Sequence, residues 1–275
     1  MSPRELAEVI GVSQSSVKRW VDAGLIGVSR TAGGHRRILL ADAVSFIRER
    51  NLDVLRPDLL GLPPRESESG QVIELTADRF YATLYEGQLD AARSMIVGAY
   101  LAGTSPAEIW DGAMAPALRR FGELYHHEQT GIFTEHRATA LCQEVLAQLR
   151  LLMPEVADEA PVAIGAAPEH DPYVLPTLIS DVVLTSGGYR TVNLGPNTPT
   201  QALEQAVEVY KPAVVWCAMV SPVSSVRLAE LTATLSTVAQ RAEVVAVGGR
   251  AAEAIDWPAP ILRCGSMRDL EAALR

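Results

Sequence analysis

The sequence predicts an α+β multidomain protein with an N-terminal winged helix-turn-helix, a central four-helix bundle and a C-terminal α/β domain with a Rossmann-type parallel sheet. Three patterns indicate this: a glycine turn between two short amphipathic segments, helical periodicity through the middle of the chain, and short apolar runs alternating with helical stretches after Pro161. The 275 residues suffice for about two or three domains. We expect domains over 1–52, 74–155 and 160–275, with a linker over 53–73.

The charge is distributed unevenly along the chain. The whole chain carries −9, from 24 Lys and Arg against 33 Asp and Glu. Residues 1–50 hold eight basic and five acidic side chains and are therefore +3, which leaves −12 for the rest. A basic head on an acidic body predicts that nucleic-acid phosphates contact the N-terminal domain alone.

The composition and the N-terminal residues also bear on localisation. No stretch approaches the ~20 apolar residues of a membrane span, and the first residues lack the order of a signal peptide. The cysteines at 142, 217 and 264 are scattered in apolar surroundings, which is typical of buried free thiols in a reducing compartment. We therefore expect a cytoplasmic protein.

The N-terminal domain is predicted from helix signals. Ser2 suits an N-cap and Pro3 the first helical position. An apolar face follows, Gly11-Val12-Ser13 interrupts it, and a second helix is expected to include residues from Ser16 to Leu25. A third helix is expected from Ala41 to Arg50.

The stretch Arg30 to Arg37 reads Arg-Thr-Ala-Gly-Gly-His-Arg-Arg and predicts a hairpin. Paired glycines permit a tight turn with positive φ, and the flanking cations suit phosphates. The amide of Gln14 can pair with an adenine edge, and His35 could either contact DNA or hold the turn through a local hydrogen bond. The candidate DNA-binding residues lie in the second helix and the hairpin: Gln14, Ser15, Ser16, Lys18, Arg19, Arg30, Gly34, His35, Arg36 and Arg37.

Helical periodicity dominates the middle of the chain after a linker rich in proline and glycine. Ser105 and Glu108 match a capping box, with Pro106 at the first helical position. A last long helix is expected from Thr134 to Leu152. Four helices with short joints predict a bundle.

The last part of the chain reads as alternating strands and helices. Apolar runs predict strands at 162–164, 191–194, 213–217 and 244–247, with a weaker one at 261–262. Helical stretches separate them, and this alternation is typical of a parallel sheet. Such sheets bind ligands at the carboxyl ends of their strands. The sequence places there the following segments: Ala166–Tyr173, Gly195–Asn197, Ser221–Ser225 and Gly248–Arg250.

The first domain is similar to the winged helix-turn-helix of the MerR family. The whole chain resembles the CarH/LitR family of cobalamin-dependent photoreceptor repressors. The resemblance implies a flavodoxin-like C-terminal domain that binds cobalamin. In that family a Trp, an adjacent His and a Glu-His pair ten residues after the Trp cap the upper face of the cofactor. Here Tyr125 stands at the Trp position, and His126, Glu135 and His136 stand at the other three.

The family's lower-face motif is Asp/Glu-x-His-x-x-Gly, whose His coordinates cobalt. Asp171 is kept, Tyr173 replaces the His, and Pro176 replaces the Gly. A phenol is a poorer donor than an imidazole, and His170 could supply the metal ligand only from a re-threaded loop. Cys217 occupies a position usually held by Ser, next to bulky Trp216. The cofactor-binding residues that the resemblance implies are Tyr125, His126, Glu135, His136, His170, Asp171, Tyr173, Ser221, Gly248 and Gly249.

The resemblance implies a DNA-binding regulator, a repressor, whose C-terminal domains sense light through adenosylcobalamin or another ligand. Its partners would be double-stranded operator DNA and further copies of the chain, with no membrane. The same regulator with a cofactor-free or repurposed site is the alternative. A corrinoid methyl carrier is disfavoured, because it needs the lower His and has no use for the basic hairpin. No nucleophile–base pair or phosphate loop points to an enzyme.

Overall fold

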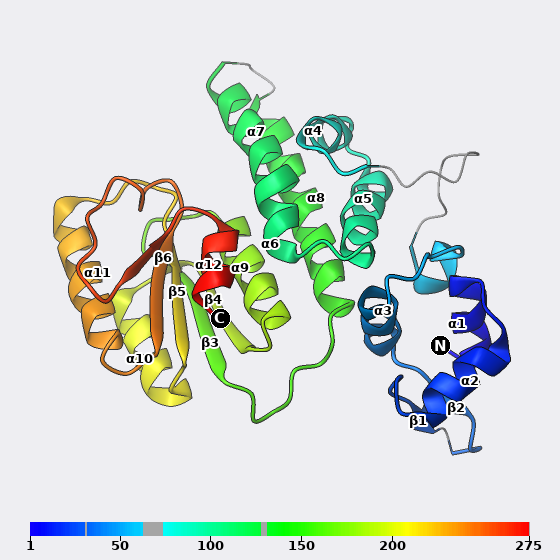
Figure 1. Ribbon diagram of the computed structural model, residues 1–275. Helices are drawn as coiled ribbons and strands as arrows, with labels where there is room; N and C mark the ends of the chain where they lie inside the picture. Colours follow the sequence, from blue (N-terminus) through cyan, green and yellow to red (C-terminus); the bar gives the residue numbers. More distant parts are fainter. Residues whose placement is uncertain (31, 63–73, 128–130, 275) are drawn as a thin grey trace. The chain divides into compact units, whose positions relative to one another are not determined.

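The computed structural model describes residues 1–30, 32–62, 74–127 and 131–274, without the side chains of 124–127. The chain divides into two compact units. The first combines Met1–Ser105 with Gly112–Glu155, and the second combines Pro106–Asp111 with Val156–Arg275. A short segment in the middle of the sequence therefore belongs to the C-terminal unit. Figure 1 shows the helices and strands of both units.

The N-terminal part contains α1 (Pro3–Ile10), α2 (Gln14–Asp22), the strands β1 (Ser29–Arg30) and β2 (Arg36–Arg37), and α3 (Leu40–Glu49). The expected start of α1 is confirmed, because the Ser2 hydroxyl accepts from the Glu5 N–H at 3.2 Å and the Glu5 carboxylate accepts from the Ser2 N–H. The expected second helix is too long. It ends at Asp22, because Gly24 adopts a φ of +73°, and Leu25 is 45 % exposed in the following turn.

Residues 53–62 of the expected linker are folded. Val54 and Leu60 are buried, and a 3₁₀ helix (Pro57–Leu60) packs against α1. The N–H groups of Leu55 and Arg56 both donate to the carbonyl of Val9. The remainder of the expected linker, residues 63–73, lies outside the described residues.

The middle of the chain is helical as predicted. It contains α4 (Ala77–Glu86), α5 (Leu89–Leu101), α6 (Pro106–Ile109), α7 (Ala115–His127) and α8 (Gly131–Leu151). Pro106 begins α6 as expected. A π-helical turn (Trp110–Met114) separates α6 from α7. In the first unit α4 packs on α5, α7 and α8, and α7 pairs with α8 around buried side chains that include Phe80, Leu84, Met95, Phe121 and Leu149.

The second unit is built on a five-stranded parallel sheet. Its strands are β3 (Val162–Pro168), β4 (Arg190–Thr198), β5 (Val214–Ala218), β6 (Val244–Gly248) and β7 (Leu262–Cys264). The spatial order is β4-β3-β5-β6-β7, which is the 2-1-3-4-5 order of flavodoxin-like sheets. The predicted parallel α/β domain is therefore confirmed.

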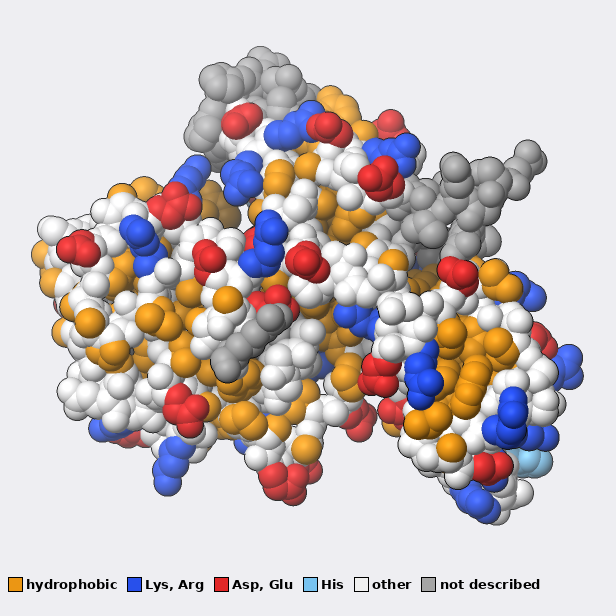
Figure 2. Space-filling model, in the orientation of Figure 1, with side chains coloured by type: hydrophobic (Ala, Val, Ile, Leu, Met, Phe, Trp, Pro, Cys, Tyr) orange, Lys and Arg blue, Asp and Glu red, His pale blue; other side chains and the backbone are white. Residues whose placement is uncertain are grey.

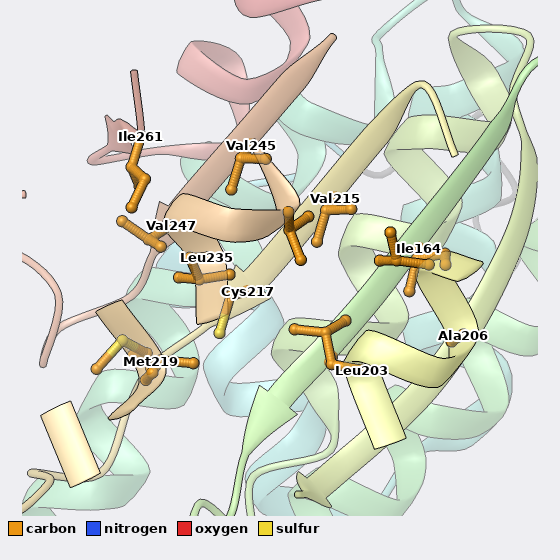
Figure 3. Packing of buried hydrophobic residues seen from close by; sticks show 14 of the residues in the cluster. Ile164, Leu203, Ala206, Val215, Cys217, Met219, Leu235, Val245, Val247 and Ile261 are labelled. Carbon is orange, nitrogen blue, oxygen red and sulfur yellow. The ribbon is translucent and has the colours of Figure 1, made fainter. Parts of the chain in front are cut away.

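Helices cover both faces of this sheet (Figure 1). α9 (Leu175–Ser186) and α12 (Met267–Ala273) lie on one face, and α10 (Thr200–Tyr210) and α11 (Ser225–Val238) lie on the other. Figure 3 shows the core beneath α10 and α11, where Ile164, Val215 and Cys217 of the sheet meet Leu203 and Leu235 of the helices. All three cysteines are buried free thiols, as predicted. Burial, and secondarily the charge of Asp171, raises the pKa of Cys217 to about 12.

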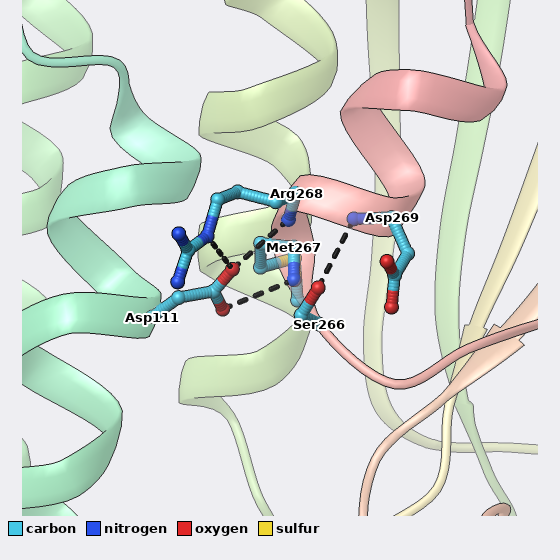
Figure 4. A network of polar contacts seen from close by, with 5 residues as sticks. All are labelled: Asp111, Ser266, Met267, Arg268 and Asp269. Atoms are coloured by element: carbon cyan, nitrogen blue, oxygen red, sulfur yellow. Dashed lines mark hydrogen bonds and ion pairs between the residues drawn. The ribbon is translucent and has the colours of Figure 1, made fainter.

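Asp111 fastens the inserted segment to the rest of the second unit (Figure 4). Its carboxylate accepts from the N–H groups of Met267 at 3.1 Å and Arg268 at 3.0 Å, in the first turn of α12. The Arg268 side chain also donates to it at 3.3 Å. Because Ser266 caps the N–H of Asp269 at 3.1 Å, two residues far apart in sequence together satisfy the start of this helix.

Replacing Asp111 with alanine should therefore loosen α12. Two N–H groups at a helix start lose a charged acceptor, so we expect a loss of about 1–2 kcal/mol in the free energy of unfolding of the second unit. Hydrogen–deuterium exchange of the α12 amides should accelerate by a corresponding factor. Glu253→Ala, at an exposed position of the same unit, is the control. Equal exchange in both variants would contradict this role.

Candidate functional site

The outward face of α2 presents the residues predicted to contact DNA. Gln14, Ser15, Lys18 and Arg19 are exposed, while Val17 on the opposite face is buried. Ser13 caps the helix by accepting from the Ser16 N–H at 3.2 Å. The hydroxyls of Ser15 and Ser16 lie 2.7 and 3.0 Å from the Ser13 hydroxyl. The candidate base-contacting residues therefore stand on a well-capped first turn.

The predicted hairpin is present, with Ser29 opposite Arg37 and Arg30 opposite Arg36 in antiparallel register. Gly34 adopts a φ of +79°, as the turn was predicted to require. Arg30, His35 and Arg37 are exposed, and Thr31 lies outside the described residues. Figure 2 shows several basic side chains on the N-terminal part of the chain, among acidic and hydrophobic ones.

Arg36 has a different role from its neighbours. Its guanidinium forms an ion pair with Asp22 at 2.7 Å, and its side chain is partly buried. Asp22 is the last residue of α2, so this pair ties the hairpin to the end of the helix. Sequence reasoning treated Arg36 as a DNA contact. The structure instead gives Arg36 a partner within the domain. The ion pair holds the hairpin, with its exposed cations, beside the end of α2.

Arg48 joins the N-terminal helices to α5, a role that the sequence did not reveal. Its guanidinium carbon lies 3.7 Å from the centroid of the Tyr100 ring, and its Nη1 donates to the carbonyl of Thr104 at 3.2 Å. Burial lowers the pKa of Arg48 and raises that of Tyr100. On the other side of α3, Phe46 packs against Trp20 of α2 with ring centroids 5.0 Å apart. Side chains of α3 thus contact both α2, through Phe46, and α5, through Arg48.

The ligand residues predicted in the helical part are only partly described. The side chains of Tyr125 and His126 lie outside the described residues, although α7 extends to His127. Glu135 and His136 lie within α8, which begins at Gly131, three residues before the predicted start. Glu135 accepts from the Thr139 hydroxyl at 3.0 Å, and the His136 side chain is 74 % exposed, with its Nε2 3.8 Å from Glu135.

Asp171 is fully buried at the carboxyl end of the sheet and accepts three backbone hydrogen bonds. Its Oδ1 accepts from the Tyr173 N–H at 3.2 Å, and its Oδ2 accepts from Val220 at 2.6 Å and Ser221 at 2.9 Å. The carboxylate thereby ties the loop after β3 to the loop after β5. These hydrogen bonds bring together three of the candidate residues: Asp171, Tyr173 and Ser221.

The two candidate side chains on the loop after β3 point away from the core. His170 adopts a φ of +70°, and its N–H donates to the Asn197 side chain at 2.7 Å. The imidazole is exposed, and the Tyr173 side chain is 44 % exposed. Within the described parts of the chain, His, Cys, Asp and Glu side chains form no group of three or more that could hold a metal ion.

Gly248 and Gly249 allow two close approaches inside the domain. A Cβ on Gly248 would overlap Cη2 of Trp216 and lie 2.7 Å from its Cζ2. Gly249 adopts a φ of +98°, and a Cβ there would overlap the Met219 carbonyl oxygen. The Met219 N–H donates to the Gly248 carbonyl at 2.7 Å. Packing of β5 against β6 therefore accounts for both glycines without a ligand.

Comparison with known proteins agrees with this architecture. A family model described as a helix-turn-helix domain matches residues 1–51, and one described as a B12 binding domain matches residues 76–150. The second match covers the helical part of the chain. Within the described residues, no helix is long and apolar enough to cross a membrane.

Two proteins are similar over most of the chain. The HTH-type transcriptional repressor CarA of Myxococcus xanthus is 27 % identical over 231 residues, which cover 77 % of this chain and 74 % of CarA. The monomethylamine corrinoid protein of Methanosarcina barkeri is 13 % identical with a TM-score of 0.52, covering 72 % of this chain and 96 % of that one, and this likeness shows the fold alone. The chain therefore combines a match to a helix-turn-helix domain with a match to a B12 binding domain, and most of it is similar to a transcriptional repressor that the sequence resemblance also points to.

Proposed function

We propose that this chain is a transcriptional repressor that binds double-stranded operator DNA through α2 and the β1–β2 hairpin. The observation that carries the proposal is the ion pair between Arg36 and Asp22, which fixes a hairpin bearing exposed cations to the end of α2. The similarity to the repressor CarA supports the same conclusion.

The proposed binding mode follows from where the exposed side chains lie. The first turn of α2, with Gln14 and Ser15, enters the major groove and reads base edges. Lys18 and Arg19 on α2, together with the hairpin as a wing, neutralise phosphates. Arg36 positions the wing and makes no independent contact. The acidic remainder of the chain is repelled by DNA, which keeps the contact confined to this surface.

Operator binding by this mode requires more than one copy. A single reader of this size makes few phosphate contacts, and helix-turn-helix proteins bind paired half-sites about 34–36 Å apart as dimers. We propose that the domains over 74–155 and 160–275 control assembly into a dimer or higher oligomer. In this scheme α4, α5, α7 and α8 act as a four-helix bundle, and residues 1–52 act as the DNA-binding domain.

The residues of the α/β domain test whether it could hold the candidate cofactor. In the α/β domain Asp171 is already committed to three amides, and Tyr173 stands where a cobalt-coordinating His would be needed. These residues do not fit a corrinoid held through its cobalt. Ligand sensing in the proposal is assigned to the helical domain, around Tyr125, His126, Glu135 and His136, with adenosylcobalamin, another flat ligand or no ligand as the remaining possibilities.

Salt-dependent DNA binding tests the proposed function. The plot of log affinity against log salt concentration should fall for a duplex selected from a randomised library, with a slope of about −0.9 per phosphate contacted. Arg37→Ala should reduce that slope by about one and weaken binding to all duplexes alike. Fluorescence anisotropy at several salt concentrations measures both quantities.

Arg4→Ala is the matched control for this experiment. Arg4 is an exposed cation of the same domain, but it pairs with Glu8 on α1 at 3.0 Å, away from the proposed surface. Its replacement should leave the slope unchanged. The proposal is overturned if the wild-type chain binds no duplex in a salt-dependent way, or if both variants lose the same affinity.

A further inference from the structure

The sheet face beneath α9 and α12 is lined by unusually small residues. Gly165 and Ala246 flank Trp216 on the neighbouring strands, in register with it. Two residues further along, Ala218 and Gly248 form the next pair on the same face. Because these are the last residues of β5 and β6, the small side chains extend to the carboxyl edge of the sheet. Such residues leave a space between the sheet and the helices above it.

The indole of Trp216 fills this space. Its side chain is the largest of the fully buried ones, with 1 % exposure. Its benzo ring lies so close to Gly248 that a Cβ at that position would overlap Cη2 of the indole. Across the sheet, a Cβ on Gly165 would lie 3.5 Å from the Ser180 hydroxyl of α9. The small residues and the indole are thus complementary in shape.

The indole is held by shape and not by hydrogen bonding. Its Nε1 is buried and has no hydrogen-bond partner among the residues that the structure describes. A buried N–H without an acceptor lowers stability, and an apolar side chain would avoid that cost. The space therefore favours a side chain with the size and shape of a fused five- and six-membered ring.

We infer that Trp216 closes the α/β domain to the benzimidazole-bearing nucleotide tail of a corrinoid. Benzimidazole is a fused five- and six-membered heterocycle like indole, so the two groups compete for the same space at the ligand-binding edge of this fold. Any corrinoid that binds this chain keeps its nucleotide tail outside the α/β core. The inference deepens the proposed function at its B12-type module and is independent of DNA binding.

A cavity variant tests whether the space takes such a heterocycle. Trp216→Ala should lower the melting temperature, and millimolar indole or 5,6-dimethylbenzimidazole should raise it again in a saturable manner. The wild-type chain should show no such rise. Trp257→Ala is the matched control, because Trp257 is only partly buried, packs on the opposite face of the sheet and donates to the Ala252 carbonyl at 3.2 Å. Its melting temperature should not respond to either heterocycle.

The wild-type protein provides a second test that does not depend on the folding of a variant. Cobinamide carries the corrin ring without the nucleotide tail. Equal affinity for hydroxocobalamin and diaquacobinamide, or no binding of either, agrees with a closed domain. A preference of more than tenfold for hydroxocobalamin, with an absorption spectrum in which benzimidazole has left cobalt, overturns the inference. Operator affinity measured on the same preparation reports on the proposed function separately.

Discussion

Replacing Asp171 with alanine is expected to lower the free energy of unfolding of the α/β unit by about 3–5 kcal/mol. The carboxylate is fully buried and accepts from three backbone N–H groups, two of them about fifty residues away in sequence. Alanine leaves these donors buried without an acceptor, and each unsatisfied group costs about 1–3 kcal/mol. Urea denaturation followed by circular dichroism measures the loss.

The conservative variant separates the hydrogen bonds from the general effect of substitution. Asp171→Asn keeps one acceptor oxygen but turns an amide NH₂ toward the remaining donors. We therefore expect a free energy of unfolding between those of the wild type and Asp171→Ala. Asp256→Ala, at an exposed position of the same unit, should change the free energy of unfolding by less than about 0.5 kcal/mol. If Asp171→Ala is as stable as Asp256→Ala, the carboxylate does not hold the two loops together.

Replacing Arg48 with alanine is expected to destabilise the first unit by about 2–3 kcal/mol. The variant loses a guanidinium stacked on Tyr100 at 3.7 Å and a charged hydrogen bond to the carbonyl of Thr104. Hydrogen–deuterium exchange should accelerate in α3 and at the end of α5. The slope of DNA affinity against salt should remain that of the wild type, because Arg48 contacts no phosphate in the proposed mode.

A double-mutant cycle isolates the interaction between the Arg48 and Tyr100 side chains. Tyr100→Leu with Arg48→Ala should give a coupling energy of about 0.5–2 kcal/mol. Arg48→Lys keeps the charge but loses the planar stack, and should recover only part of the stability. Glu49→Ala is the control, since Glu49 is exposed at the end of the same helix. A coupling energy near zero would show that the ring contact contributes nothing.

The sequence predicted those parts of the fold that depend on local patterns. Buried runs such as Val244–Gly248 are strands because both faces of a parallel sheet are covered, which leaves a continuous apolar signal. Ser2 and Pro3 mark the start of α1 because capping acts within one turn. The hairpin was found because the turn at Gly34 requires a residue tolerant of positive φ.

The parts that sequence reasoning missed depend on contacts between distant residues. Two of the three partners of Asp171, and both partners of Arg48, lie about fifty residues away, so no spacing rule points to them. Arg36 reads as one more cation of the hairpin until Asp22 is seen beside it. The sequence shows that bulky Trp216 adjoins Cys217, but it does not show that the indole packs against Gly248.

The segment Pro106–Asp111 has a consequence for how the chain is made. It belongs to the α/β unit but leaves the ribosome before α7 and α8, while α9 and α12, on which α6 packs, are synthesised later. The C-terminal unit can therefore complete itself only when translation is nearly finished, after the helices on either side of this segment have emerged. A fragment that begins at residue 156 would therefore lack Pro106–Asp111, a piece of its own architecture.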